Sequence, residues 1–257
     1  MVIKDIHLLN PPNHHIEVDS CMNVRVDRFT ATAPHDSPNS DGINFYGGFD
    51  QSLTNSIISN GDDCISVVPV NLGAAFCLQR PEPDRQRCRG GHVVVTNVSC
   101  IGSHGVSIGG IRNGYVNNVT FSDLRATGVP FDTQGKYSPG GLRIKSYPNG
   151  TGSVTDIHFS NIDIYHVYLA IEIQSIYCPK GGCAAGNSAV KFDNITFSNV
   201  TSNTHRSQKA DFACSALSPC TGIVLDNVDL GAGGVADCSY ADVQFVGKST
   251  PAQCTAT

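Results

Sequence analysis

Short apolar segments alternate with polar, turn-forming residues along the whole chain. The apolar segments are rich in Val, Ile and Phe, and Asn, Asp, Ser and Gly separate them, which is typical of brief β-strands joined by turns. Apolar residues at helical spacing are scarcely present, so we predict an all-β protein with very little helix. Examples of such segments span residues 2–9, 16–19, 24–32, 42–46, 64–68, 92–98, 105–108, 141–146, 170–174 and 222–225.

A repeat runs through the middle of the chain. Phe121, Phe159 and Phe197 each open a similar Phe-Ser-Asp/Asn-apolar pattern, at intervals of 38 and 38 residues. Self-similarity at a period of ~20–50 residues is typical of solenoids and propellers, in which each repeat buries its apolar face against its neighbours. Two-residue hairpin turns are largely missing and blade signatures are absent, so we predict a parallel β-helix that forms one domain over residues 1–257. Asparagines at strand entries, such as Asn118 and Asn161, are expected to adopt left-handed turn conformations.

Composition and charge limit the classes of function. The 257 residues are 40% apolar and 15% charged, which suits one domain with a continuous core. The net charge of −5 argues against a nucleic-acid-binding surface. No apolar run approaches the ~18 residues that span a bilayer. We therefore expect neither nucleic acid nor a membrane as a partner, and we expect a monomer.

Eleven cysteines and five Asn-x-Ser/Thr sequons indicate an oxidising, secretory compartment. The candidate glycosylation sites are Asn97, Asn118, Asn149, Asn194 and Asn199. No signal-peptide pattern opens the chain, so we expect that Met1 is not the natural start and that a signal peptide and N-terminal coils are missing. We therefore predict a secreted, extracellular protein.

Five polar clusters fall at the starts or ends of predicted strands. They lie at residues 39–41, 61–63, 103–105, 143–145 and 174–177. Because stacked strands lie ~4.8 Å apart, equivalent positions on successive turns of a solenoid form a ladder on one face. Three carboxylates, an imidazole and two cations would then converge on a single cleft.

Clustered carboxylates suit the hydrolysis of a glycosidic bond. That reaction needs one carboxyl kept protonated as acid and another ionised as base or nucleophile, and crowding like charges raises one pKa. Asp62 and Asp63 are neighbours, so both reach one cleft only from an irregular strand entry, such as the preceding Asn-Gly turn supplies. Arg143 and Lys145 alternate with an apolar residue, so both can face the cleft and bind a substrate carboxylate. Taken alone, Asn-Gly-Asp-Asp is also typical of a polar turn or a loose cation site.

In order and spacing, these clusters resemble the motifs of the polygalacturonases of glycoside hydrolase family 28. Asn39-Ser-Asp41 resembles the family's Asn-Thr-Asp, Gly61-Asp-Asp63 its Gly-Asp-Asp, Ser103-His-Gly105 its Gly-His-Gly, and Arg143-Ile-Lys145 its Arg-Ile-Lys. The resemblance spans residues 3–180. Each tripeptide alone is a weak signal, whereas four in the family's order form a strong one.

The resemblance implies a right-handed, single-stranded parallel β-helix of the pectin-lyase-like kind. It also implies that the protein hydrolyses the α-1,4 galacturonosyl bonds of polygalacturonate (pectin) with inversion, without a metal or other cofactor. In the implied roles Asp62 is the general acid, and Asp41 and Asp63 activate water. His104 supports the protonation state of the acid or contacts substrate. The implied substrate-binding residues are Arg143, Lys145, Tyr177, Asn39 and Gln174.

Two features favour the release of single galacturonates from a chain end. The segment 70–91 contains Cys77 and Cys88 and a charged run. We expect this segment to wall off one end of the cleft, and the same pattern is also typical of a surface loop clipped by a disulfide. Ser103 replaces the first Gly of the family's histidine motif, which is similar to exo-acting members.

Proximity and the family resemblance imply five disulfides and leave Cys21 unpaired. The expected pairs are Cys64–Cys100, Cys77–Cys88, Cys178–Cys183, Cys214–Cys220 and Cys238–Cys254.

Three alternative functions stay open. An endo-acting polygalacturonase would use the same site. A pectate lyase also uses a parallel β-helix, but it resembles this chain less, since it needs a calcium-binding acidic site and a basic proton abstractor. A non-catalytic β-helix that binds carbohydrate would keep the repeats without needing three clustered carboxylates.

Overall fold

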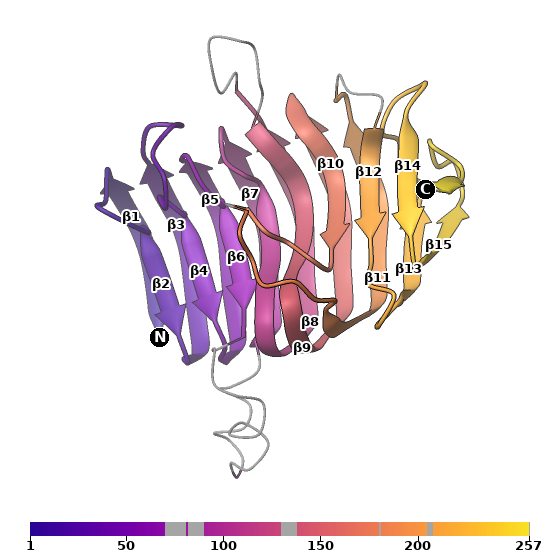
Figure 1. Ribbon diagram of the computed structural model, residues 1–257. Helices are drawn as coiled ribbons and strands as arrows, with labels where there is room; N and C mark the ends of the chain where they lie inside the picture. The colour runs from indigo at the N-terminus through magenta and orange to yellow at the C-terminus, as the bar shows by residue number, and fades with distance from the viewer. Residues whose placement is uncertain (70–80, 82–89, 130–137, 180, 205–207, 257) are drawn as a thin grey trace.

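The structure is a computed structural model that describes residues 1–69, 81, 90–129, 138–179, 181–204 and 208–256. Over these residues it contains strands and no α-helix, and the strands lie side by side along one elongated stack (Figure 1). Every pairing between the strands is parallel, which confirms the predicted parallel β-helix. In the described ranges, no helix has the length and apolarity needed to cross a bilayer.

The strands form two surfaces of the coil. We call the first the cleft sheet, and it consists of β2 (Ile16–Asp19), β4 (Ile43–Tyr46), β6 (Ile65–Val68), the starts of β8 (Val106–Thr127) and β9 (Ser138–Tyr165), β10 (Val167–Gln174), β12 (Gln208–Ala213), β14 (Val235–Ser239) and β16 (Cys254–Ala256). The back sheet consists of β1 (Val2–Leu9), β3 (Met22–Thr32), β5 (Phe49–Ser59), β7 (Gly90–Ile101), the later parts of β8 and β9, β11 (Ala189–Ser202), β13 (Cys220–Asp226) and β15 (Ala241–Val246). Because β8 and β9 are long and bend around the coil, each contributes to both sheets.

The coil bends at residues with positive φ. In β8 the residues other than glycine with positive φ are Asn118 (φ 57°) and Asp123 (φ 56°), and in β9 they include Asn161 (φ 55°). Asn and Asp adopt this left-handed conformation more readily than other L-residues. Asn161 Nδ2 also donates to Asp123 Oδ1 at 3.2 Å, which links the bends of adjacent coils. The predicted left-handed asparagines are confirmed, although they lie at bends within continuous strands and not at strand entries.

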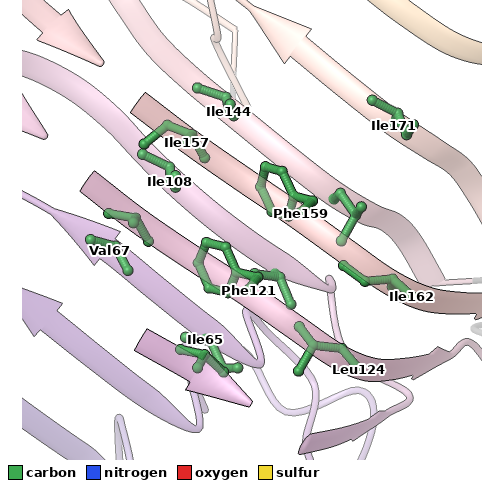
Figure 2. Packing of buried hydrophobic residues seen from close by; sticks show 14 of the residues in the cluster. Ile65, Val67, Ile108, Phe121, Leu124, Ile144, Ile157, Phe159, Ile162 and Ile171 are labelled. Carbon is green, nitrogen blue, oxygen red and sulfur yellow. The ribbon is translucent and has the colours of Figure 1, made fainter. Parts of the chain in front are cut away.

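The 38-residue repeat stacks aromatic rings inside the coil. Phe121 pairs in register with Phe159, and Phe159 pairs with Phe197. The ring centroids lie 5.0 and 4.9 Å apart, and all three side chains are fully buried. Figure 2 shows Phe121 and Phe159 packed among aliphatic side chains that include Ile108 and Ile144 of the cleft sheet. Full burial of each ring stabilises the fold by about 1.5–3 kcal/mol. Because the rings stack from one coil to the next, the repeat produces one continuous apolar core.

Four of the five expected disulfides are present. They are Cys64–Cys100, Cys178–Cys183, Cys214–Cys220 and Cys238–Cys254. Cys21 forms no disulfide, as expected. The expected pair of Cys77 with Cys88 lies outside the described residues. The asparagines of all five sequons are exposed.

Candidate active site

The polar clusters meet because they enter neighbouring strands of the cleft sheet at the same level. The first residues of β4, β6 and β8 pair with one another in the sheet. Asp41, Asp63 and His104 each lie two residues before the first residue of their strand. A backbone hydrogen bond continues the ladder between the loops, since His104 N donates to Asp62 O at 2.8 Å. The strand entry at residues 60–64 is irregular, so both neighbouring aspartates reach the same cleft.

Two glycines of these motifs allow the coils to approach closely. A Cβ at Gly61 would lie 2.6 Å from the backbone N and O of Ser37. Gly105 has a φ of +86°, and a Cβ there would lie 2.1 Å from Gly141 O on the next coil. Only glycine fits such contacts, and glycine adopts a positive φ without strain. The tight packing fixes the backbone from which the acids and the imidazole project.

A cavity of about 370 Å³ opens over these clusters. Seven of the nine predicted site residues line it: Asn39, Asp41, Asp62, Asp63, His104, Lys145 and Tyr177. The other two, Arg143 and Gln174, do not line this cavity. The structure therefore brings the predicted acids together with one of the two predicted cations.

Asp62 is surrounded by hydrogen-bond donors. Its Oδ1 lies 3.1 Å from His104 Nδ1 and accepts from Asp63 N at 2.8 Å, and its Oδ2 accepts from Asn39 N at 3.0 Å. Burial raises the pKa of Asp62, but the His104 imidazole and the two backbone N–H groups outweigh burial and lower the pKa to about 2. Asp62 is therefore ionised in the free site.

Asp41 has the opposite environment. Burial raises the pKa of Asp41, and the negative charges of Asp63 and Asp62 raise it further, to about 6, while His14 and Asn44 oppose the shift. Asp41 Oδ1 lies 3.7 Å from His14 Nε2, too far for a normal hydrogen bond. In mildly acidic solution the free site thus keeps its proton on Asp41, not on the Asp62 that the resemblance assigns as the acid.

Both cations of the Arg-Ile-Lys motif are engaged by carboxylates. Lys145 Nζ lies 3.1 Å from Asp63 Oδ2, and both side chains are nearly buried, at 6% and 10% exposure. Arg143 Nε lies 2.7 Å from Glu172 Oε2 on the next coil. The Tyr177 ring centre lies 5.0 Å from Lys145 Nζ and 5.6 Å from the Arg143 guanidinium carbon, so the tyrosine packs against both cations.

Sequence reasoning missed six polar residues of the cavity wall: His14, Tyr46, Ser66, Arg112, Asn113 and Tyr147. His14 lies two residues before β2, at the same ladder level as Asp41, and its Nδ1 is 2.6 Å from Glu17 Oε1. Extending the ladder one coil back from Asp41 would have found it. Arg112 and Tyr147 belong to no motif, and only the alignment of β8 with β9 brings them together.

Asp62, Asp63 and His104 also present ligand atoms within 4.8 Å of one another, a donor set that a divalent cation could use. All three groups already have partners within the protein, because His104 Nδ1 lies 3.1 Å from Asp62 Oδ1 and Lys145 Nζ lies 3.1 Å from Asp63 Oδ2. A cation would have to displace them. The arrangement therefore fits acid–base chemistry better than metal binding, and the absence of a metal requirement stays a prediction.

Acids, an imidazole and a cation gathered in one cleft of a parallel β-helix define the class of site that cleavage of a glycosidic bond requires. The model of the glycosyl hydrolases family 28 matches residues 1–252, and the chain belongs to this family. A polygalacturonase of Persea americana is 33% identical over 239 residues, which cover 91% of this chain and 46% of that protein. An exopolygalacturonase of Platanus acerifolia is 31% identical over 258 residues, which cover 98% of this chain and 62% of that protein.

Solved structures share the fold. The polygalacturonase from Erwinia carotovora ssp. carotovora superposes with a TM-score of 0.74 at 24% sequence identity, over 94% of this chain and 56% of that one. At this identity the likeness shows the β-helix alone. The chain spans about half the length of the relatives that it matches, from 46% to 62%.

Proposed function

We propose that this protein hydrolyses the α-1,4 galacturonosyl bonds of polygalacturonate by acid–base catalysis with inversion. The observation that carries the proposal is the convergence of Asp41, Asp62 and Asp63 in one cavity, where their surroundings separate the pKa of Asp62, about 2, from that of Asp41, about 6. Hydrolysis of a glycosidic bond needs one ionised and one protonated carboxyl at the same pH. Membership of glycosyl hydrolases family 28 and the likeness to polygalacturonases support the choice of substrate.

In the proposed reaction, Asp62 protonates the glycosidic oxygen, Asp41 and Asp63 together activate the water that attacks the anomeric carbon, and the Asp63 carboxylate takes the proton of that water. Among the described residues, Asp63 Oδ1 has no hydrogen-bond partner, so it is an acceptor to which such a water can donate. A bound galacturonate adds a negative charge to the cavity, which raises the pKa of Asp62 and favours the protonated form of its carboxyl. Lys145 and Tyr177 hold the sugar at the cleavage point, and Arg143 supports them through the Tyr177 ring.

The free-site pKa values favour a second assignment in which Asp41 is the acid. A substrate with a good leaving group, such as nitrophenyl galacturonide, separates the two assignments because its departure needs no proton. The variant that lacks the acid should keep much of its activity on this substrate, whereas a variant that lacks the base should lose it. We expect Asp62→Asn to be the variant that is rescued, and rescue of Asp41→Asn instead would reverse the roles.

The overall reaction is tested with polygalacturonate in the presence of a chelator. We expect reducing ends to appear without an ultraviolet-absorbing double bond, and we expect Asp62→Asn to bind the polymer without turning it over. A product that absorbs in the ultraviolet and requires calcium would identify a lyase. Binding without turnover by the unaltered protein would identify a carbohydrate-binding β-helix.

Exo action and secretion are finer parts of the proposal. Ser103 is buried, and its Oγ accepts from Gly105 N at 3.1 Å, so it shapes the turn that carries His104. Most of the segment 70–91, which we expect to close one end of the cleft, lies outside the described residues. Early release of single galacturonates would support exo action, whereas mixed oligomers and a rapid fall in viscosity would refute it.

Four disulfides support secretion, because disulfides persist in oxidising compartments.

A further inference from the structure

Arg112 is the cation of the cavity wall that no carboxylate engages within the described part of the chain. Lys145, the other Lys or Arg that lines the cavity, lies 3.1 Å from Asp63 Oδ2. Arg143 is also occupied, by Glu172 at 2.7 Å. Carboxylates thus largely neutralise the positive charges that the family motif supplies. Arg112, which belongs to no motif, is the Lys or Arg of the cavity wall without a carboxylate partner among the described residues.

Arg112 is held in place by an aromatic ring. Its guanidinium carbon lies 3.9 Å from the centre of the Tyr147 ring, one coil further along the stack. The ring packs over Gly110, where a Cβ would lie 2.7 Å from the Tyr147 ring. A guanidinium that stacks on an aromatic face keeps the N–H groups of its edge available for a carboxylate. Arg112 is exposed, so these groups face the solvent of the cavity.

The Tyr147 ring connects this position to the proposed cleavage point. Its centroid lies 5.9 Å from that of Tyr177, whose ring packs against Lys145. Arg112 and Lys145 therefore flank two neighbouring aromatic rings in the same cavity. Rings of this kind offer broad apolar surfaces against which the C–H faces of sugars can pack. The cavity volume of about 370 Å³ falls in the range that accommodates ligands larger than one sugar.

We infer that Arg112 and Tyr147 form a second uronate subsite, which binds the carboxylate of the galacturonate unit next to the one at Lys145 and Tyr177. This inference rests on the proposed function, because it assumes that an oligogalacturonate occupies the cavity. The guanidinium fork fits a carboxylate through two parallel N–H···O bonds. The subsite thus selects units that carry a free carboxylate over units in which that group is a methyl ester.

The test compares two arginines that stack on tyrosines between the same two strands. Arg112→Ala should raise KM for trigalacturonate about 10- to 100-fold with little change in kcat, since it removes a charge-assisted interaction of the bound substrate. Arg125→Ala is the matched control, because Arg125 is exposed and lies 5.0 Å from the Tyr165 ring but does not line the cavity. It should leave KM unchanged. Arg112→Lys should give an intermediate KM, because it keeps the charge and loses the fork.

Methyl-esterified trigalacturonate supplies the second arm of the test. The ester should weaken binding to the unaltered protein. It should also remove most of the difference in KM between the unaltered protein and Arg112→Ala. Equal KM values for Arg112→Ala and Arg125→Ala on trigalacturonate, in a protein that hydrolyses it, would overturn the subsite and leave the proposed function intact. Failure of the unaltered protein both to hydrolyse trigalacturonate and to bind it in calorimetry would overturn both.

Discussion

Replacing Asp41 by Asn should stabilise the fold at neutral pH. The pKa of Asp41 is raised from 3.8 to about 6, because burial and the charges of Asp63 and Asp62 disfavour its ionised form. A shift of about 2 units corresponds to about 3 kcal/mol, and the side chain is only 13% exposed, so solvent screens little of it. The stability that the protonated carboxyl contributes is complete below pH 3.8 and is lost as the pH rises through about 6. Above that pH, the ionised Asp41 destabilises the fold relative to a neutral side chain of the same shape.

The measurement is urea unfolding of both proteins at intervals between about pH 3.5 and 7.5. Circular dichroism is the suitable probe, because the chain contains no Trp. Asp41→Asn should be more stable than the unaltered protein at pH 7 by up to about 3 kcal/mol, and the difference should shrink towards pH 4.

Asp62→Asn is the control with the opposite sign. The pKa of Asp62 is lowered to about 2, so its ionised form contributes stability above pH 3.8 that is lost as the pH falls through about 2. This variant should therefore be less stable at pH 5–7. Parallel stability profiles for Asp41→Asn and the unaltered protein, or a less stable Asp41→Asn at pH 7, would refute the reasoning.

Three further predictions concern the stability of the fold around the site and in the core. Lys145→Met should lower the free energy of unfolding in urea by about 3–5 kcal/mol, because it leaves Asp63 as a buried carboxylate without its cation. Adding Asp63→Asn should recover much of this loss, and strictly additive losses would contradict the pairing. Replacing Cys64 and Cys100 by Ala should cost about 4 kcal/mol, because the bond joins residues 36 apart, and an unchanged melting temperature would be evidence against this. Phe159→Ala should cost about 3–5 kcal/mol, because the ring is stacked on both sides, and a loss below about 1 kcal/mol would argue against a continuous core.

The sequence predicts most of the fold because the phenylalanines of the core recur at a constant interval of 38 residues. The predicted strands at 2–9 and 16–19 coincide with β1 and β2. In contrast, β5 is not among the example segments, and polar residues occupy part of its buried face. Gln51 and Ser56 are 1% and 2% exposed, and their side chains bond the backbone oxygens of Cys21 and Thr54. Such local hydrogen bonds satisfy buried polar groups but leave no apolar pattern in the sequence.

The sequence predicts which acids form the site, but it does not predict their relative pKa values. Asp41, Asp62 and Asp63 converge because the strands that follow them are in register, which the motif spacing indicates. The difference in pKa between Asp62 and Asp41 depends on the His104 imidazole and two backbone N–H groups that face Asp62, and on the deeper burial of Asp41. Only the folded loops reveal the backbone N–H groups and the burial. Arg112 is invisible to motif reasoning for a similar reason, since its role depends on a ring supplied by the next coil.

The anomeric configuration of the first product tests the central claim most directly. Proton NMR of polygalacturonate hydrolysis, recorded before mutarotation, should show the β-anomer accumulating first, because water attacks the α-linked carbon from the opposite face with the carboxylates as acid and base. An initial α-anomer would contradict the account. It would instead require a covalent sugar–carboxylate intermediate, a mechanism that normally uses closely spaced carboxyls such as Asp62 and Asp63, whose oxygens approach within 4.8 Å.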